Sequence, residues 1–568
     1  MHCVGSARLL SRQLNTMTTT PRYHWWMSLA LLAVSGAVGL AFLGARESLP
    51  WRVREAGDQN VLRIVYTQPL RPDPHARLFP LSTYNHFVLS LWEPLVECDP
   101  ATGEPQPAAA ASWSWSADRR LLTLRLRPDA RWSNGDRVTA HDFVRAWRRL
   151  LRSRLDLAYT LFALKNAEAY HRGQRENPET VGVRALDDLT LQVELDQPRT
   201  TLVAELADPL LAPLHHSTEK VLAEKIIYQE PTALVTNGPF RLARANTDGF
   251  RLEASPAYHD RAKVRLAGVH FIRAINPVSG ALMVAAGVAD LLPSMDYMFE
   301  RGLPTHRAVA VESELTLGVV ANYFNVTRGP LRDLRVRQAL ALALNREELI
   351  DEYDRARLVP AWSWVPDMPG RKGLELFSED AGKARRLLTD AGFPEGKGFP
   401  VLRMSLPLGM EGSPYPAACG ERWFKELGIR TYVAYEAPSV RNERMNAGDF
   451  DIVYGTVVAT VPDAADLLTT FTMPAEYSET RWRDEEIIRL LAAANQKTGT
   501  ERLALLETAE RRAMAAVPAV PLMFERRHTL RSTEVRGWYA DPLARQSPKR
   551  LWLESPAPSN RSEPLPGT

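Results

Sequence analysis

The chain has few cysteines and almost no net charge. Three Cys occur among 568 residues, none in a spacing typical of a metal site, and they fit any redox compartment. We expect Cys98 and Cys419 to remain unpaired. The 70 Lys and Arg residues are nearly balanced by 67 Asp and Glu residues, which leaves a formal charge of +3. Composition therefore gives no support to a nucleic-acid-binding surface.

Sequence patterns of common enzymes are also missing. The chain has no Gly-x-Ser-x-Gly, no Gly-x-x-x-x-Gly-Lys, no His-Glu-x-x-His and no dinucleotide-binding fingerprint after a strand. The carboxylate pairs Asp187-Asp188 and Glu485-Glu486 have surface-like surroundings, and a loop explains His215-His216 better than a pair of metal ligands does. We therefore predict no catalytic residue, no metal and no cofactor, although only a measured turnover would reveal an enzyme.

One long apolar run stands near the N-terminus. Trp25 to Gly44 is uncharged and 20 residues long, and it follows Arg8, Arg12 and Arg22. At ~1.5 Å per residue a helix of this length crosses a hydrocarbon core of roughly 30 Å. The preceding positive charge orients the rest of the chain outward. An uncleaved anchor at residues 25–44 and a cleaved secretory signal both stay open, and a buried core helix is less favoured. The anchor and the cleaved signal both predict that the rest of the protein is periplasmic or otherwise extracytoplasmic.

A strand, a turn and two helices are predicted between Asn322 and Ile350. Tyr323 to Val326 is a β-prone run that a Gly-Pro pair ends. Apolar residues from Val336 to Leu344 then recur at helical spacing. Asn345, with Glu348 three residues later, is typical of the start of a second helix.

A second informative stretch lies further upstream. Leu122 to Leu126 alternates apolar and polar residues, which predicts a half-buried strand. Asn134-Gly135 is a tight-turn dipeptide. Thr139 is suited to cap a helix with Asp142 in its first turn and an apolar stripe from Phe143 to Leu151.

Two more helices are predicted from local signals. Ser378 is placed to cap a helix that begins with two carboxylates and ends before Gly392. The run from Ser279 to Leu291 also has a helix-like composition.

These segments, in this order, resemble bacterial extracellular solute-binding proteins of family 5, the oligopeptide- and dipeptide-binding type that serves ABC importers. The resemblance runs from about Val61 to Leu553. It implies an α/β fold of the two-lobed periplasmic-binding-protein type (class II) with an inserted accessory domain. The segments that carry the resemblance are Leu91–Val96, Trp132–Phe143, Tyr323–Leu340, Gly448–Ile452 and Pro518–Leu522.

The resemblance also implies how the chain is divided. A signal or anchor with its linker precedes the two lobes, and a polar, proline-rich tail that we expect to be disordered follows them. The expected parts are the N-terminal segment (1–57), the first lobe (58–88, 226–313 and 524–554), the accessory domain (89–225), the second lobe (314–523) and the tail (555–568).

The resemblance implies a protein that binds a solute without catalysing a reaction. The lobes would close by hinge motion around a peptide or other small solute, and the closed form would deliver it to an ABC permease in the inner membrane. We expect a monomer with no nucleic-acid partner. A membrane-anchored sensor or scaffold on the same fold, and a binding protein for a non-peptide solute, remain open alternatives.

The chain departs from the family at one position that bears on the ligand. Peptide-binding relatives carry Trp-x-x-Asp-Tyr-x-x-Pro after the Gly-x-Tyr-Asp-Ile strand, and this Asp takes the α-ammonium group of the ligand. Here Val457 stands at the Trp position and Thr460 at the Asp position. A buried ammonium without a carboxylate is strongly penalised, so a peptide in the usual register is disfavoured. Asp463 or Asp466 is the alternative partner.

Five other residues are expected at the wall of the ligand cleft. The resemblance places Tyr159 in the accessory domain near the cleft, and Arg77 and Phe79 in the first loop. Trp362 and Trp364 follow the helix that lines the second lobe, and large aromatics are favoured in such sites. A core role for Tyr159 and a solvated loop position for Arg77 are the competing interpretations.

Overall fold

The fold was analysed in a computed structural model. It describes residues 60–76, 82–99, 102–153, 156–295, 308–350, 357–368, 370–408, 410, 413–473, 475 and 478–554. The apolar run Trp25–Gly44 lies outside this part of the chain. Within the described residues, no helix combines the length and apolar character needed to cross a membrane.

One large mixed sheet links the two halves of the fold. Its eleven strands run in the order β15-β14-β16-β12-β17-β11-β1-β10-β9-β8, with β13 paired to β17. The pairs of β1 with β10 and β11, and of β14 with β15 and β16, are parallel. The strands are β1 (Val61–Tyr66), β8 (Phe240–Asn246), β9 (Gly249–Ala254), β10 (Gly268–Arg273), β11 (Leu291–Met295), β12 (Val309–Phe324), β13 (Leu358–Pro360), β14 (Leu402–Pro407), β15 (Thr431–Glu436), β16 (Ile452–Val458) and β17 (Ala519–Ser532).

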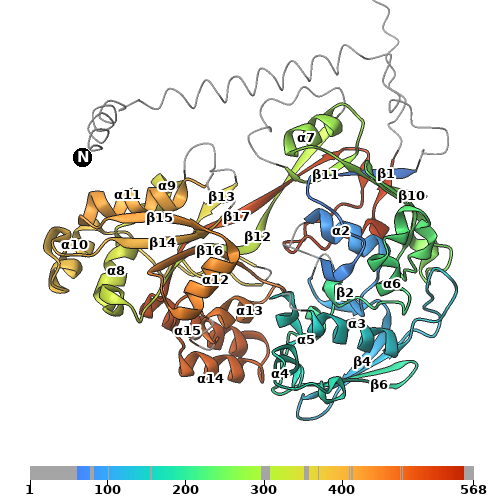
Figure 1. Cartoon of the computed structure of the whole chain (residues 1–568), viewed down its shortest axis with the longest axis horizontal. Helices are drawn as coiled ribbons and strands as arrows, with labels where there is room; N and C mark the ends of the chain where they lie inside the picture. The colour runs from blue at the N-terminus through green and yellow to red at the C-terminus, as the bar shows by residue number, and fades with distance from the viewer. Residues whose placement is uncertain are drawn as a thin grey trace, which may run out of the picture. The chain divides into compact units, whose positions relative to one another are not determined.

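Strands β12 and β17 pass from one half to the other (Figure 1). Their antiparallel register runs from Val309 opposite Ser532 to Leu315 opposite Arg526, and it resumes with Val319 opposite Phe524. The strand predicted at Tyr323 is therefore only the end of a 16-residue strand. Its first eight residues are not fully buried, so they lack the apolar pattern that marks a core strand.

The region between Ala110 and Glu194 is built on its own four-stranded sheet. The strand predicted from Leu122 to Leu126 is confirmed, and so is the helix that follows Thr139, whose N–H (2.8 Å) and hydroxyl (3.0 Å) donate to the Asp142 carboxylate. The sheet has the order β4-β5-β7-β6, and its elements are β4 (Ala110–Trp115), β5 (Leu121–Leu126), β6 (Val183–Asp187), β7 (Thr190–Glu194), α3 (Ala140–Arg152) and α4 (Ala167–His171).

The first half and this four-stranded region share one hydrophobic core. Leu62 of β1, Phe87 of α2 (Ser82–Leu91) and Trp147 of α3 belong to the same buried cluster. The expected boundary between residues 88 and 89 falls inside α2. The accessory region is thus continuous with the first half in its packing, while the second half has separate clusters around Leu340 and Trp364.

The second half confirms one predicted helix start and corrects another. Asn345 caps α9, and its side chain accepts from the Glu348 N–H at 3.1 Å. The prediction that Ser378 caps the next helix is wrong, because α10 begins after Asp380, whose carboxylate accepts from the Lys383 N–H at 2.8 Å. The helices of this half are α8 (Leu334–Leu342), α9 (Arg346–Leu349), α10 (Ala381–Asp390), α11 (Tyr415–Leu427), α12 (Pro438–Ala447), α13 (Ala464–Leu468), α14 (Glu485–Ala494) and α15 (Gly499–Ala516).

The helix predicted from Ser279 to Leu291 is too long. Helix α7 (Pro277–Ala285) is followed by Gly287 at φ +77°, a conformation that suits glycine and ends the helix, and Leu291 opens β11. Between them the buried Asp290 holds Arg63 at 2.8 Å, which fixes the start of β11 beside β1. The remaining elements are α5 (Leu202–Glu205), α6 (Thr218–Ala223), β2 (Val96–Cys98), β3 (Pro105–Pro107), β18 (Val535–Arg536) and β19 (Trp552–Leu553).

Replacement of the helix-capping carboxylate tests this packing. Asp142→Ala removes the acceptor for Thr139 and for the buried indole N–H of Trp132, which donates to Asp142 at 3.2 Å. We expect a loss of about 1–3 kcal/mol in unfolding free energy, because a buried donor is left unpaired. Urea unfolding of the full chain measures it, with the exposed turn variant Asp118→Ala as control. Equal unfolding midpoints for the two variants would contradict the assignment.

Candidate functional site

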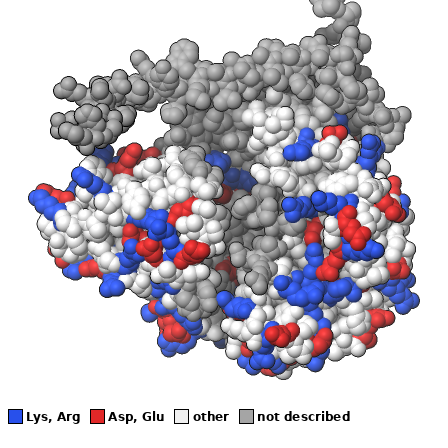
Figure 2. Space-filling view, viewed as in Figure 1, with Lys and Arg blue, Asp and Glu red and all other residues white. Residues whose placement is uncertain are grey.

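Three parts of the chain that are distant in sequence meet in the structure. They are the loop 459–463 after β16, the segment 199–208 near α5, and the closing segment 541–545 after β18. Figure 2 shows charges of both signs interspersed over both halves on the face displayed. We call the polar contacts between these parts the interlobe contact; it contains Arg199, Thr200, Glu205, Asp208, Thr460, Asp463, Asp466, Asn495, Arg502 and Arg545.

Asp463 is bonded within the second half. It caps α13 by accepting from the Ala465 N–H at 2.8 Å. Its two oxygens also lie 2.9 and 3.0 Å from the guanidinium nitrogens of Arg502 on α15. Both carboxylate oxygens therefore have partners from the protein.

Asp466 organises the loop at the position where relatives carry the ligand-binding Asp. Its Oδ2 accepts from the N–H of Thr460 at 2.5 Å and from its hydroxyl at 2.9 Å. Its Oδ1 lies 3.7 Å from Arg199 Nη2. Both carboxylates considered as substitutes for the missing Asp thus already accept hydrogen bonds from the protein, and Asp466 Oδ1 keeps only its 3.7 Å contact with Arg199.

Three arginines carry the contact between the halves. Arg199 also pairs with Glu205 at 2.6 Å, and burial raises the pKa of Glu205 although Arg199 opposes the shift. Arg502 reaches Thr200, which donates to Asn495 at 3.2 Å.

Arg545 makes the third connection. Its Nη2 donates to Asp208 at 3.1 Å and to the backbone carbonyl oxygen of Thr460. One guanidinium thus joins the closing segment, the accessory region and the second half.

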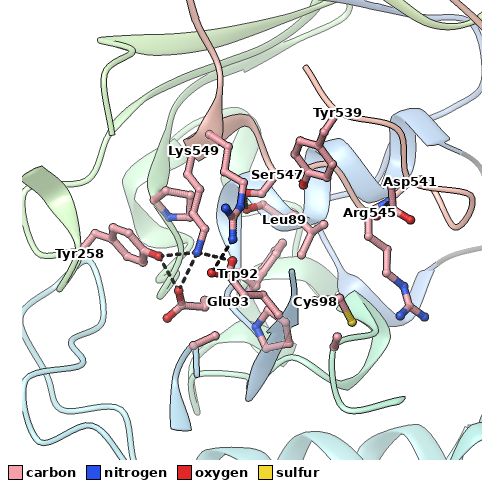
Figure 3. A pocket seen from close by; sticks show the side chains of 16 residues that line it. Leu89, Trp92, Glu93, Cys98, Tyr258, Tyr539, Asp541, Arg545, Ser547 and Lys549 are labelled. Atoms are coloured by element: carbon pink, nitrogen blue, oxygen red, sulfur yellow. Dashed lines mark hydrogen bonds and ion pairs between the residues drawn. The ribbon is translucent and has the colours of Figure 1, made fainter. Parts of the chain in front are cut away.

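A small cavity of about 40 Å³ lies beside Arg545. On one side Glu93 accepts from Tyr258 and from His259, the latter at 2.7 Å, and Lys549 pairs with Glu97 at 2.7 Å (Figure 3). It is lined by Leu89, Trp92, Glu93, Pro94, Glu97, Cys98, Ala108, Ala207, Pro239, Tyr258, Tyr539, Asp541, Arg545, Ser547, Lys549 and Arg550.

The charges of this cluster are stabilised by one another. Burial disfavours the charged form of Lys549, but Glu93 and Glu97 outweigh it and raise its pKa. Burial, together with the nearby Glu93 carboxylate, raises the pKa of Tyr258 well above its ordinary value. Tyr258 and Lys549 therefore stay protonated at neutral pH and hold the Glu93 and Glu97 carboxylates in place.

The two predicted tryptophans have different surroundings. Trp364 is fully buried, its indole N–H donates to the Leu467 carbonyl at 3.0 Å, and its ring packs against Phe471. Its position is that of a core residue. Trp362 is half-buried, and the Arg346 guanidinium lies 5.2 Å from its ring centroid.

The other predicted site residues are scattered. Val457 is half-buried on β16 opposite Val319, next to the loop that carries Thr460. Tyr159 is 49% exposed. Arg77 and Phe79 lie outside the described residues. Among the described residues of the predicted set, the structure brings Thr460 and Asp463 into the interlobe contact.

The cysteines and histidines do not form a metal site in the described part of the chain. No cluster of three or more His, Cys, Asp or Glu suited to a metal ion occurs there. Cys98 and Cys419 are both free thiols, as expected. Nε2 of the buried His215 lies 3.2 Å from Asp136, so this histidine has a structural partner.

The sequence interpretation missed the residues that make the contact. Glu93, which pairs with Lys549 beside the cavity, lies in a segment that resembles the family, but the resemblance indicated no ionic cluster there. Arg199, Arg502 and Arg545 are ordinary arginines in a chain with 70 basic residues, and no local pattern distinguishes them.

Comparison with known proteins identifies the family. The profile of bacterial extracellular solute-binding proteins, family 5 (middle part), matches residues 104–479, about two thirds of the chain. The chain belongs to this family. The family 5 chain is 26% identical over 453 residues to the dipeptide-binding protein DppE of Bacillus subtilis (strain 168), covering 78% of this chain and 82% of that protein.

Two further similarities support the assignment. The chain is 28% identical over 469 residues to the probable deoxycholate-binding periplasmic protein YgiS of Escherichia coli (strain K12), covering 78% and 84% of the two chains. The unliganded open form of the murein tripeptide-binding protein MppA superposes with a TM-score of 0.70 at 25% identity, covering 87% and 97%. The two-lobed α/β fold expected from the sequence is confirmed.

A buried histidine ties α2 to the segment that carries Arg545, and its protonation should loosen that segment. His86 Nδ1 lies 2.6 Å from the Gln546 carbonyl oxygen, so the neutral ring donates there. Burial lowers its pKa to about 4 from 6.5. The unfolded chain then binds more protons between these values, so stability is full above pH 6.5 and falls as the pH drops towards 4.

This dependence is measured by thermal unfolding of the full chain between pH 4 and 7. We expect His86→Gln to flatten part of the slope, while the exposed control His141→Gln leaves it unchanged. His75 contributes in the same direction, since burial also lowers its pKa to about 4. Identical slopes in wild type and His86→Gln would show that His86 is not the group responsible.

Proposed function

We propose that this family 5 protein captures a peptide or peptide-like solute outside the cytoplasm and delivers it to an ABC permease. The family match over residues 104–479 carries the proposal. The relatives named for dipeptide and murein-peptide binding support a peptide ligand. Since the relatives are binding proteins, we propose that the protein acts without catalysis, as a monomer, and that residues 25–44 serve as its signal or membrane anchor.

We further propose that the chain passes from the first lobe to the second between residues 313 and 314 on β12, and returns to the first between residues 523 and 524 on β17. The register of β12 against β17 is interrupted between Leu315 and Val319, close to both positions. An irregular pair of strands bends more easily than a regular one, which supports hinge motion at this level. The inserted accessory domain at residues 89–225 would move with the first lobe, because the two share a core.

The residues of the interlobe contact have a direct part in this motion. Arg502, Arg199 and Arg545 each hold a group of the second lobe together with one of the first lobe or accessory region. Opening separates these pairs, and a solute bound between the lobes supplies the free energy that favours their closure. The arginines thus set how readily the empty protein closes.

A solute without a free ammonium group is the second candidate. Thr460 stands where peptide-binding relatives have an Asp, and Asp463 and Asp466 are bonded to Arg502 and Thr460. A ligand ammonium would share these carboxylates with Arg502, Arg199 and Thr460, which weakens them as partners for a second cation. A relative named for probable deoxycholate binding supports a non-peptide cargo within this family.

Mass spectrometry of small molecules released from the purified full chain separates the two candidates. A mixture of short peptides is the expected result for the first, and one non-peptide species is the result for the second. A protein that releases nothing and shows no thermal shift with any member of a peptide and bile-acid library would contradict both. It would favour the sensor or scaffold on this fold.

The contact itself is tested by Arg502→Gln. Arg502 Nη2 lies 3.5 Å from the Thr200 hydroxyl across the two halves, and the Arg502–Asp463 pair that positions it is 12% and 21% exposed. Water and salt screen this pair only partly, so the loss of Arg502 should weaken the closed arrangement. We expect faster hydrogen exchange in peptides covering residues 199–208 and 459–468 of the full chain. The control Arg385→Gln breaks a more exposed pair with Glu426 inside the second half. Unchanged exchange in Arg502→Gln would contradict the assigned role.

A further inference from the structure

One face of the sheet in the first half carries a row of basic side chains. Arg244 on β8 lies opposite Arg251 on β9. Arg251 in turn lies opposite His270 on β10, and His270 lies opposite Arg63 on β1. Side chains that stand directly opposite one another share a face of the sheet, so these four residues form one line, which we call the basic row. Because neighbouring strands are about 4.8 Å apart, the row extends over about 14 Å.

The basic row lies in a segment with an excess of positive charge. Residues 240–273 contain seven Lys and Arg residues but only three Asp and Glu residues. Asp290 pairs with Arg63 at 2.8 Å, and Glu253 pairs with Arg241 beside the row at 2.7 Å. These pairs leave the segment with a positive excess, which an anionic partner would complement.

Helix α7 covers part of the same face. Val65, on the same face of β1 as Arg63, belongs to one buried cluster with Ala281 and Val284 of α7. Leu62, on the opposite face of β1, belongs to the cluster that contains residues of α2. Figure 1 shows α7 and α2 on opposite sides of β11. Helix α7 and the basic row therefore form one outer surface of the first half.

The side of α7 that points away from the sheet is apolar. The buried positions of the helix are Gly280, Ala281, Val284 and Ala285. Helical spacing places Ser279, Leu282 and Ala286 on the other side, where each is half-buried or exposed. Ile275, just before the helix, is 92% exposed, and no charged residue occurs between Arg273 and Asp290. A surface helix normally has a charged or polar outer side, so α7 is suited to an apolar environment on this side as well.

The course of the chain favours a membrane as the partner of this surface. Strand β1 carries Arg63 and begins at Val61, whereas the apolar run predicted as a signal or anchor ends at Gly44. The 16 residues between them reach about 55 Å when fully extended, so a retained anchor keeps the sheet close to the bilayer. Apolar side chains flanked by arginines are also the pattern of helices that lie on anionic membranes.

We propose that the outer surface formed by α7 and the basic row binds membranes that contain acidic phospholipid. The outer side of α7 enters the boundary between headgroups and acyl chains, and the guanidinium groups of the basic row bind lipid phosphates. This surface shares no residue with the interlobe contact, so the second lobe can still move while the first lobe is bound. The inference takes from the proposed function only the location outside the cytoplasm, and it does not depend on the solute.

The first measurement is hydrogen exchange of the full chain in lipid nanodiscs of two compositions. One contains phosphatidylcholine alone, and in the other phosphatidylglycerol replaces part of it. We expect residues 274–289 to exchange about fivefold more slowly in the acidic discs, as for at least one arginine bound to the anionic surface. Residues 381–390 of the second half should exchange equally in both discs. Added salt should remove the difference, because it screens the basic row.

A first pair of variants tests the basic row. Arg244→Gln combined with Arg251→Gln removes two positive charges from the row and should remove most of the difference between the discs. The control combines Arg386→Gln with Arg430→Gln, which removes the same charge from exposed positions of the second half. Equal unfolding temperatures show that both variants fold. Wild-type behaviour of the Arg244 and Arg251 variant, or the same loss in the control, would refute the role of the row.

A second pair tests the apolar side of α7. Ile275→Ser combined with Leu282→Ser should restore fast exchange at residues 274–289 in the acidic discs, because less apolar area enters the lipid. The control combines Val401→Ser with Leu408→Ser, whose side chains are 53% and 56% exposed in the second half. Slow exchange that persists in the α7 variant would contradict insertion of this helix.

Two further outcomes would overturn the proposal and identify another partner. Equal slowing in neutral and acidic discs would show that the surface needs no acidic headgroup. Slowing in vesicles made from bacterial inner membranes, without slowing in either disc, would assign the surface to a membrane protein. Absence of slowing in all three would leave the surface without a membrane partner.

Discussion

The pairing of β12 with β17 is the constraint on which the rest of the structure depends. These two strands are hydrogen-bonded to each other on both sides of the break at Leu315 and Val319, and each half of the sheet is built outward from them. Because the hydrogen-bonded pairs of β12 and β17 continue through both halves, the halves cannot separate. They can change their relative orientation only by bending at the break. A bend at the break moves the β16–α13 loop relative to the segments that face it, which is where the interlobe contact forms.

The chemistry of that loop follows from its internal bonds. Asp466 fixes the backbone of Thr460, and Asp463 is held by Arg502, so the loop keeps its shape without a ligand. A preformed loop lowers the ordering cost of binding, and its carboxylates already accept hydrogen bonds from the protein. Under the proposed function, the same bonds that keep the loop rigid reduce what these carboxylates offer to a cationic ligand.

The fold was largely predictable because its signals are local. Thr139 with Asp142 and Asn345 with Glu348 are three residues apart, and each pair marks a helix start that the structure contains. Where two local signals compete, the outcome depends on distant partners: Asp380 caps the helix in place of Ser378, and its N–H donates to the Leu342 carbonyl at 3.0 Å. The interlobe contact was not predictable for the same reason. Arg545 and Asp208 are 337 residues apart, and neither segment carries a local sequence pattern that indicates the other as its partner.

The ion pairs also differ in a way that bears on how the protein moves. Within the second half Arg371 and Glu510 are 4% and 0% exposed, and within the first half Glu93 is 4% exposed beside Lys549. Breaking such pairs leaves a buried charge, which is costly. Arg199 and Asp466, which bridge the halves, are 31% and 11% exposed, so water can solvate them once they part. The Arg199–Asp466 pair therefore yields before the internal ones, and the two halves move as units around the shared strands.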